Sequence, residues 1–328
     1  MTEKRILIVG AGTMGGNYAR MLSGGRVPGA TLAGIVDLNL DRAIAVLGPG
    51  ATPTHSSLGP ALTDLQPDAA YIATPDALHR EPVVTCARAG VPILVEKPLA
   101  ITVDDGQAML DSVERAGIHA QVNYSNRWNP PYARAKQAIE AGEIGTVRSF
   151  NARLSNVIAS PRDRLAWSGQ TTSAWFLMSH CLDLAAWLGG RTALTAYASG
   201  SKGILSGLGI DTYDWIHAVI RFDDGSDGVF ESVWMLPESW PAGIEFNFRI
   251  LGSNGLIDVD TTNQNITLMG KRPEYPGTIT WAVDRFGSFL DALDGRPATV
   301  VTFSEALHAT RMLVAIHKSL ESGSVELV

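Results

Sequence analysis

The sequence contains little cysteine and no long apolar run. Cys86 and Cys181 are the two cysteines among 328 residues, which excludes a disulfide framework and a CxxC metal knuckle and favours a reducing cytoplasm. No window reaches the ~20 uninterrupted apolar residues of a membrane helix, so no membrane association is expected. The apolar run Ile6–Val9 is too short for the core of a signal peptide, so secretion is not expected either.

An excess of positive charge is also absent. Lys and Arg number 26 and Asp and Glu 33, so the formal net charge is −7 and no nucleic-acid partner is expected. A hydrophobic fraction of 45% with 18% charged residues is typical of a globular enzyme and excludes global disorder. The histidines form no H-E-x-x-H motif and no close pair, so no metal site is predicted.

Up to Asn123, short apolar segments alternate with segments of helical pattern. Apolar runs without polar alternation are typical of strands covered on both faces, and their alternation with helices predicts a parallel, doubly wound sheet. Residues 1–123 are therefore predicted to form a Rossmann domain of the α/β class. The predicted strands are Arg5–Val9, Leu32–Val36, Ala69–Ala73, Ile93–Val95 and His119–Val122.

The pattern changes after Asn123, where longer segments alternate like antiparallel strands with one covered face. Residues 124–328 are predicted to form an α+β domain with one large, mostly antiparallel sheet. Its predicted strands are Val147–Leu154, Tyr213–Phe222, Gly228–Leu236, Phe246–Leu251, Leu256–Asp260 and Ile266–Met269. Its predicted helices are Pro131–Ala141, Ser173–Leu188, Val283–Leu293 and Ser304–Ser322.

A glycine-rich turn stands between the first predicted strand and the first predicted helix. Gly10, Gly12 and Gly15 match G-x-G-x-x-G, with Thr13 and Met14 at the start of the helix. The first glycine permits a tight turn, the second lets a pyrophosphate approach, and the third lets helix and strand pack closely, while the helix N-terminus donates N–H groups to phosphates. A plain strand-to-helix turn is the alternative, but the position of the motif favours dinucleotide binding.

Asp37 ends the second predicted strand. It follows Gly15 at close to the ~20-residue spacing of the acid that accepts hydrogen bonds from the ribose. A carboxylate accepts from the 2′-OH and repels a 2′-phosphate, so NAD is predicted over NADP, although Arg42 nearby keeps NADP open. The alternative role of Asp37 is to cap the helix that follows.

The segment Val95–Leu99 carries a second motif, Glu-Lys-Pro. Through it the chain resembles the Gfo/Idh/MocA oxidoreductase family, which includes glucose-fructose oxidoreductase and inositol dehydrogenases. Further segments agree in order and spacing, so that the resemblance covers essentially the whole chain: Ala73–Asp76 followed by His79, Asn123–Trp128, Gly142–Gly145 and His180–Asp183. The resemblance implies an NAD-dependent oxidoreductase that interconverts a secondary alcohol and a ketone on a sugar, a cyclitol or a related polyhydroxylated small molecule.

Lys97 directly follows a predicted parallel strand, at the end where open α/β sheets place their ligands. Its ammonium can bind the hydroxyl that is oxidised and stabilise the developing alkoxide, so Lys97 is predicted to be catalytic. The alternative is a surface lysine before a turn proline. Glu96 is predicted to position the chain or the lysine, and the bond before Pro98 is prone to the cis form. The residues assigned to the cofactor side, besides the glycine turn and Asp37, are Thr74, Pro75, His79, Glu96 and Lys97.

His180 lies in an apolar predicted helix. The resemblance implies a catalytic or substrate-binding histidine here, and imidazole titrates near neutrality, which suits proton transfer as hydride leaves. A packed core histidine is the alternative. Asp183 lies one turn further along the helix and is predicted to orient the ring of His180 or to bind a substrate hydroxyl. The alternative is a buried hydrogen bond from the helix to a loop.

The substrate side departs from the family at Phe176. Many inositol-dehydrogenase-like members carry an aspartate at this position before the histidine, whereas this chain has Phe176 beside Trp175. The loss of a hydroxyl acceptor predicts a more apolar pocket in which either aromatic stacks on a sugar ring, with core packing as the alternative. The segment that joins the domains carries three predicted substrate-side residues: Tyr124, Asn126 and Arg127. Arg127 is predicted either to bind a substrate or to form a salt bridge between the domains.

Four functions stay open at this point. A dehydrogenase that uses NAD is favoured, and an NADP-dependent reductase of sugars or ketones is the second. A nucleotide-binding sensor without turnover is the third, and an enzyme whose tightly held cofactor cycles between two substrates is the fourth. The presence of Lys97 and His180 favours an enzyme, because a sensor needs no acid–base pair. The broad sheet resembles the assembly surface of the family, so a homodimer or homotetramer is expected.

Overall fold

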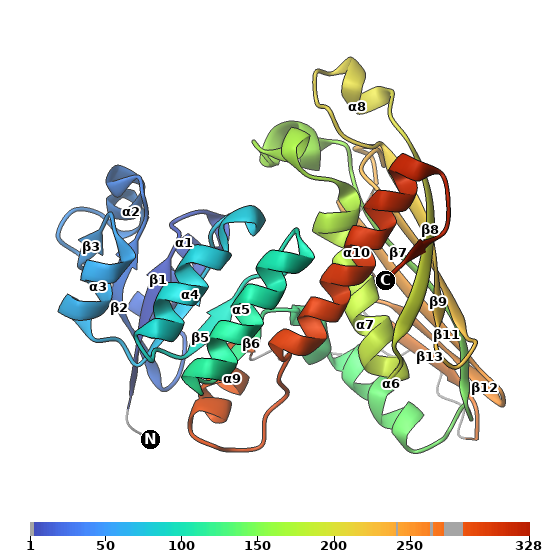
Figure 1. Ribbon diagram of the computed structural model, residues 1–328, viewed down its shortest axis with the longest axis horizontal. Coiled ribbons are helices and arrows are strands. Elements are labelled where there is room, and N and C mark those ends of the chain that lie inside the picture. Colours follow the sequence, from blue (N-terminus) through green and yellow to red (C-terminus); the bar gives the residue numbers. More distant parts are fainter. Residues whose placement is uncertain (1–2, 241, 263–264, 272–284) are drawn as a thin grey trace. The chain divides into compact units, whose positions relative to one another are not determined.

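The computed structural model describes residues 3–240, 242–262, 265–271 and 285–328. The chain divides into two compact units, which are described one at a time (Figure 1). The first unit comprises Met1–Ser125 with Asp284–Thr310, and the second comprises Asn126–Val283 with Arg311–Val328. This division differs from a single boundary at residue 123, because a segment near the C-terminus belongs to the first unit.

The first unit is built on a parallel sheet. Its strands are β1 Lys4–Val9, β2 Ala30–Val36, β3 Thr54–His55, β4 Ala69–Ile72, β5 Ile93–Val95 and β6 Ala120–Val122. Its helices are α1 Thr13–Ser23, α2 Leu40–Leu47, α3 Leu58–Leu65, α4 Arg80–Arg88, α5 Val103–Ala116 and α9 Arg285–Leu293. The strand order β3-β2-β1-β4-β5-β6, with every described pairing parallel, confirms the doubly wound fold. Strand β3 is absent from the predicted set because two residues show no alternation.

Helix α9 explains why a C-terminal segment belongs to the first unit. Phe286 and Phe289 are buried in the same core as Tyr18 and Tyr71, and the ring centroids of Tyr18 and Phe286 are 5.2 Å apart. Burial of a phenylalanine stabilises a fold by ~1.5–3 kcal/mol, so the two rings stabilise the packing of the helix on the sheet. The sequence predicts this helix but assigns it to the second domain, and its predicted start at Val283 lies outside the described residues.

The second unit contains an eight-stranded sheet. Its strands are β7 Val147–Asn156, β8 Ala193–Ser201, β9 Trp215–Phe222, β10 Asp227–Val233, β11 Ile244–Gly252, β12 Gly255–Asp260, β13 Asn265–Met269 and β14 Glu326–Leu327. The order is β13-β12-β11-β7-β10-β9-β8-β14, and among the described pairings of named strands only β7 with β10 is parallel. The predicted mostly antiparallel sheet is confirmed. The prediction misses β8 because its Ala, Ser and Gly residues have low strand propensity, and pairing with β9 and β14 forms it.

Helices cover one face of this sheet. The helices of the unit are α6 Pro130–Glu140, α7 Ser179–Gly189, α8 Ile204–Gly207 and the part of α10 Phe303–Ser322 beyond Thr310, and a π-helical segment, Ala174–Met178, directly precedes α7. In Figure 1, α6, α7 and the second half of α10 run along the same side of the sheet. The covered face is apolar, since Phe150, Phe222 and Phe248 are almost fully buried there.

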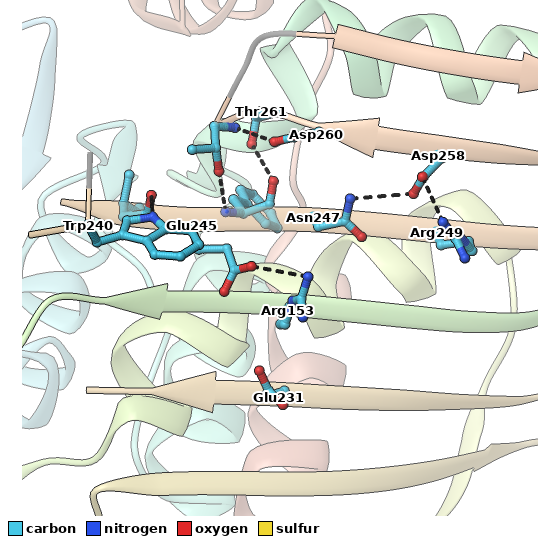
Figure 2. A network of polar contacts seen from close by, with 12 residues as sticks. Arg153, Glu231, Trp240, Glu245, Asn247, Arg249, Asp258, Asp260 and Thr261 are labelled. Carbon is cyan, nitrogen blue, oxygen red and sulfur yellow. Dashed lines mark hydrogen bonds and ion pairs between the residues drawn. The ribbon is translucent and has the colours of Figure 1, made fainter. Parts of the chain in front are cut away.

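The opposite face of the sheet carries polar and charged side chains in cross-strand pairs (Figure 2). Arg153 on β7 pairs with Glu245 on β11 at 3.1 Å, and Arg249 on β11 pairs with Asp258 on β12 at 2.9 Å. Partly exposed ion pairs each contribute roughly 0–1 kcal/mol. The buried apolar face therefore determines the register of the strands, and these ion pairs on the open face add little to it.

Candidate active site

The predicted nucleotide turn lies between β1 and α1. Gly10 has a φ of +98°, which favours glycine, and a Cβ on Gly15 would lie 1.8 Å from the carbonyl oxygen of Gly10. A Cβ on Gly12, by contrast, would meet nothing within 4 Å in the described part of the chain beyond its own neighbours. Gly12, Thr13 and Met14 are exposed at the N-terminal end of α1. The turn needs Gly10 and Gly15 for its own folding, and the open space at Gly12 suits the approach of a pyrophosphate.

Asp37 follows β2 and is held against the turn. Its Oδ2 accepts the N–H of Ala11 at 2.8 Å, and its Oδ1 accepts the N–H of Asn39 at 2.8 Å. The side chain of Asn39 caps α2 by accepting from the N–H of Arg42, so the alternative role of Asp37 as the helix cap is wrong. Each carboxylate oxygen has two lone pairs, so Asp37 retains acceptor capacity for a ribose hydroxyl. Its charge is partly balanced by Arg42, at 3.9 Å.

His79 joins two loops at the carboxyl edge of the first sheet. It is fully buried, with Nδ1 3.0 Å from the carbonyl oxygen of Pro98 and Nε2 3.1 Å from that of Thr74. These contacts connect the loop after β4 to the turn after β5, where the Lys97–Pro98 peptide bond is cis. Thr74 is half-buried and Pro75 is exposed. His79 thus shapes the two loops through main-chain oxygens.

Glu96 lies directly after β5 in a buried hydrogen-bond network. Its Oε1 accepts from the hydroxyl of Tyr71 and from Nδ2 of Asn123, the latter at 2.7 Å. Its Oε2 accepts the N–H of Lys97 at 3.3 Å. Burial, together with the charge of Glu96, raises the pKa of Tyr71 well above its usual value, so the phenol stays protonated and donates. The network supports a positioning role for Glu96 toward Lys97, which is half-buried.

Asp76 adds an acidic group that the predicted site lacks. Burial raises the pKa of its carboxyl above the usual range, while the charges of Lys97 and His79 act in the opposite direction. Its Oδ2 is buried and meets no donor in the residues that the structure describes. Asp76, His79 and Lys97 therefore form an electrostatically coupled group at the carboxyl ends of β4 and β5.

His180 and Phe176 share one face of the helical segment in the second unit. Between Ser173 and Ala185 these two side chains are half-buried, and all the others are buried. Trp175 is 9% exposed and stacks on His317, with ring centroids 4.9 Å apart and planes 15° apart. Burial and stacking favour the core-packing alternative for Trp175, and its contact with a substrate stays a prediction. Phe176 faces the same side as His180.

Arg127 and Asp183 form a buried ion pair within the second unit. Nη2 of Arg127 lies 2.7 Å from Oδ1 and its Nε lies 3.0 Å from Oδ2. Each side chain is 2% exposed, and the ring of Trp187 lies 5.5 Å from the guanidinium. The pair does not join two domains as predicted, because both residues belong to the second unit. Burial and two-pronged pairing favour a structural role for both residues over direct substrate binding.

Tyr124 and Asn126 bracket the change from the first unit to the second. Tyr124 belongs to the first unit and is fully buried, so its side chain exposes no surface for the predicted contact with a substrate. Asn126 is half-buried in the second unit, in the short helix Ser125–Trp128. Of these two predicted residues, only Asn126 retains an exposed surface.

Several residues of these networks escape prediction from the sequence. Asn123 directly follows β6, and the positional rule that points to Lys97 also points to it. Tyr71 lies inside the apolar run of β4, where it looks like any core aromatic. Oγ1 of Thr172 lies 2.8 Å from Nε2 of His317. The two residues are 145 positions apart, so no local sequence pattern links them.

No helix in the described ranges is long and apolar enough to span a membrane. Within those same ranges, no three His, Cys, Asp or Glu side chains gather as metal ligands would. Cys86 and Cys181 are both buried and free, and burial raises the pKa of Cys86 to about 12, so it stays a thiol.

Two stretches of the chain match families of known proteins. Residues 4–124 match the GFO_IDH_MocA family, described as an oxidoreductase family with an NAD-binding Rossmann fold. Residues 132–258 match the GFO/IDH/MocA C-terminal domain. The chain belongs to the GFO/IDH/MocA family. The match confirms the resemblance, the NAD-binding Rossmann domain and the oxidoreductase class.

Individual relatives match along the whole length. Myo-inositol dehydrogenase Hyg17 of Streptomyces leeuwenhoekii is 29% identical over 333 residues, which cover 98% of each chain. The crystal structure of scyllo-inositol dehydrogenase from Lactobacillus casei, with NAD(H) and scyllo-inositol, has a TM-score of 0.83 at 16% identity and covers 99% of this chain and 98% of that one. The WlbA dehydrogenase from Bordetella pertussis, with NADH and UDP-GlcNAcA, has a TM-score of 0.81 at 24% identity and covers 99% of each chain. The two structures establish the fold of both units.

Proposed function

We propose that this protein is an NAD-dependent oxidoreductase that interconverts a secondary alcohol and a ketone on a cyclitol, a sugar or a related polyhydroxylated molecule. The observation that carries the proposal is Lys97, held at the carboxyl end of β5 by Glu96 in the unit that also carries the glycine turn. The name of the full-length myo-inositol dehydrogenase relative supports the class of substrate.

Lys97 and His180 carry the proton chemistry in this proposal. Bound NAD supplies the hydride acceptor. Lys97 binds the substrate hydroxyl and stabilises the developing alkoxide, and the half-buried imidazole of His180 takes up the proton. Such a positioned base contributes about 10²- to 10⁴-fold in rate. Glu96 acts through Lys97 as a positioning residue.

The turn and Asp37 favour NAD over NADP. The open space at Gly12 and the exposed N-terminal end of α1 fit a pyrophosphate. The fixed carboxylate of Asp37 accepts from ribose hydroxyls and repels a 2′-phosphate. Arg42 lies 3.9 Å from that carboxylate, and this contact is the reason to test NADP as well.

We also propose a homodimer or homotetramer that assembles through the open face of the eight-stranded sheet. Tyr197, Val219 and Val229 are neighbours on β8, β9 and β10, and they are 45%, 40% and 43% exposed. An apolar row among polar residues favours association. Light scattering after gel filtration is expected to show a dimer or tetramer, and Val229→Lys is expected to yield a smaller species. A monomeric wild type contradicts this proposal.

The proposed setting is the cytoplasm, with a small molecule as partner and no nucleic acid or membrane. The buried free thiols of Cys86 and Cys181 suit a reducing compartment. The formal net charge of −7 disfavours polyanionic partners.

The absorbance of reduced nicotinamide tests the function across cyclitols, sugars and sugar acids, with NAD and NADP assayed separately. Wild type is expected to turn over at least one of them with NAD preferred, and Lys97→Met to lower kcat by about 10²- to 10³-fold, because the group that stabilises the alkoxide is lost. Lys202→Met is the matched control, because Lys202 pairs with Asp211 on the surface of the second unit. Tight NADH binding without turnover of any compound would instead favour the sensor.

A further inference from the structure

Phe176 belongs to an aromatic cluster on the same face as His180. The ring of Trp167 meets Phe176 edge-on, with centroids 6.0 Å apart and planes at 71°, and the ring of Trp234 lies 5.9 Å from Phe176. Trp234 is fully buried, whereas Trp167 and Phe176 are half-buried. Trp167 and Phe176 therefore form a partly exposed aromatic wall, backed by Trp234.

The segment that carries Phe176 is fixed at its start. Nδ1 of His317 lies 2.7 Å from the carbonyl oxygen of Leu313, which only accepts, so this nitrogen donates. Nε2 then accepts from the hydroxyl of Thr172 at 2.8 Å, and the same hydroxyl oxygen accepts the N–H of Trp175 at 3.3 Å. Burial lowers the pKa of His317, which favours the neutral ring that this arrangement requires. Phe176 is thus presented from a backbone held at a defined place.

The aromatic wall discriminates between hydroxyl and apolar groups. Phe176 has no hydrogen-bonding atom, and Trp167 has one indole N–H. A substrate hydroxyl pressed against Phe176 loses water without gaining a partner, whereas a methyl group there is removed from water and packs. Aromatic rings also pack against the C–H face of a saturated ring.

Resting on the proposed dehydrogenase function, we propose that the aromatic wall selects a sugar or cyclitol that carries an apolar group close to the carbon that is oxidised. Suitable groups are a deoxy carbon, an O-methyl group or the methyl of an N-acetyl group. The wall shares a face with His180, so the apolar group and the reacting hydroxyl lie at the same end of the substrate. Fully hydroxylated sugars and cyclitols are the poorer substrates.

Pairs of compounds that differ in one apolar group test this selection. Suitable pairs are myo-inositol with its mono-O-methyl ethers, and D-glucose with 6-deoxy-D-glucose. Wild type is expected to favour the apolar member by about fourfold or more in kcat/KM, the ratio that burial of one methyl group corresponds to. Saturation-transfer NMR on the same compounds, with NADH present, measures binding independently of turnover.

Four variants test whether the aromatic wall causes the preference for the apolar member of each pair. Phe176→Leu and Trp167→Leu are each expected to reduce it to less than twofold, and Phe176→Asp to reverse it, because a carboxylate accepts from the hydroxylated member. Trp215→Leu is the matched control, since Trp215 lies on β9 and its described ring contact is His217. Trp167 is half-buried, so its variant remains informative if the changes at Phe176 impair folding.

The outcomes separate this inference from the proposed function. The inference is overturned if wild type prefers the hydroxylated members, if both leucine variants retain the full preference, or if Trp215→Leu loses it equally. Binding that favours the apolar members and depends on the wall, without turnover of any pair, upholds selection by the wall and counts against the dehydrogenase. Turnover without any preference upholds the dehydrogenase and overturns the inference.

Discussion

The two units hold their functional groups by different means. In the first unit, Gly10 and Gly15 shape a turn through close backbone contacts, and Asp37 is held by main-chain N–H groups. In the second unit, charged and polar side chains bind one another, as in the pair of Arg127 and Asp183. A site shaped by backbone contacts fails when atoms are added to it. A site shaped by buried side-chain pairs fails when one partner is removed.

The largest effect on stability is expected at the buried ion pair. Asp183→Ala removes the carboxylate from a guanidinium that is 2% exposed, and the loss of one partner from a buried pair costs about 3–5 kcal/mol. The melting temperature is expected to fall by roughly 10 °C. The double variant Arg127→Met with Asp183→Leu is expected to recover most of the loss, because no unpaired charge remains. An Asp183→Ala protein with unchanged melting temperature and lost turnover would restore the substrate-binding role of Asp183.

Paired glycine substitutions test the first unit. A Cβ at Gly15 would lie 1.8 Å from a backbone oxygen, so Gly15→Ala is expected to destabilise the fold by ~1–3 kcal/mol in thermal unfolding. Gly12→Ala places its methyl in open space and is expected to leave the melting temperature unchanged. The same methyl obstructs the pyrophosphate, so NADH affinity in a fluorescence titration is expected to fall at least about tenfold, or 1.36 kcal/mol. Equal stability losses in both variants, with NADH affinity retained by Gly12→Ala, would contradict the division of roles.

The same difference determines how far the sequence predicts each unit. The glycine turn, Asp37 and Glu96–Lys97 all lie at the ends of recognisable strands, and parallel topology brings those ends to one edge. Local pattern and connectivity are therefore sufficient to locate the cofactor side. Tyr71 is the exception, because its partner Glu96 is revealed only by the packing of β4 beside β5.

The substrate side depends on contacts between distant positions. Asp183 meets Arg127 across 56 positions, and helix docking alone decides that they pair with each other. Trp175 and Phe176 are adjacent and chemically alike, yet the stacking of Trp175 on His317 directs them to different surroundings. No periodicity in the sequence distinguishes two neighbouring aromatics of this kind.

Cofactor choice offers a smaller test of the backbone-held site. Asp37→Asn retains an oxygen that accepts from one main-chain N–H and removes the charge that repels a 2′-phosphate. The ratio of kcat/KM for NAD over NADP is expected to fall about tenfold, an effect of ~1.4 kcal/mol. Arg42→Ala is the companion variant, and it is expected to raise the same ratio if Arg42 assists NADP. An unchanged ratio in Asp37→Asn would show that Asp37 does not determine the preference for NAD over NADP.

The smallest effect concerns the pH dependence of the side-chain network in the second unit. Burial lowers the pKa of His317 below its usual value of 6.5, so the unfolded chain binds a proton at this residue at a higher pH than the folded chain does. The contribution of His317 to stability is therefore complete above about pH 6.5 and is lost as the pH falls below that value toward the folded pKa. The slope cannot exceed about 1.36 kcal/mol per pH unit for one proton.

His317→Gln tests that sign, because the amide retains a donor and an acceptor but does not titrate. Unfolding by urea between pH 7.5 and pH 5 is expected to show a slope that is smaller in the variant than in wild type. His217→Gln serves as the control, since His217 is exposed beside Glu231 on the open sheet face. If wild type and His317→Gln lose stability in parallel, the ring is not held neutral by its partners. Thr172 and Leu313 would then not fix the segment that carries Trp175 and Phe176, and the comparison between the two units would rest on the buried ion pair alone.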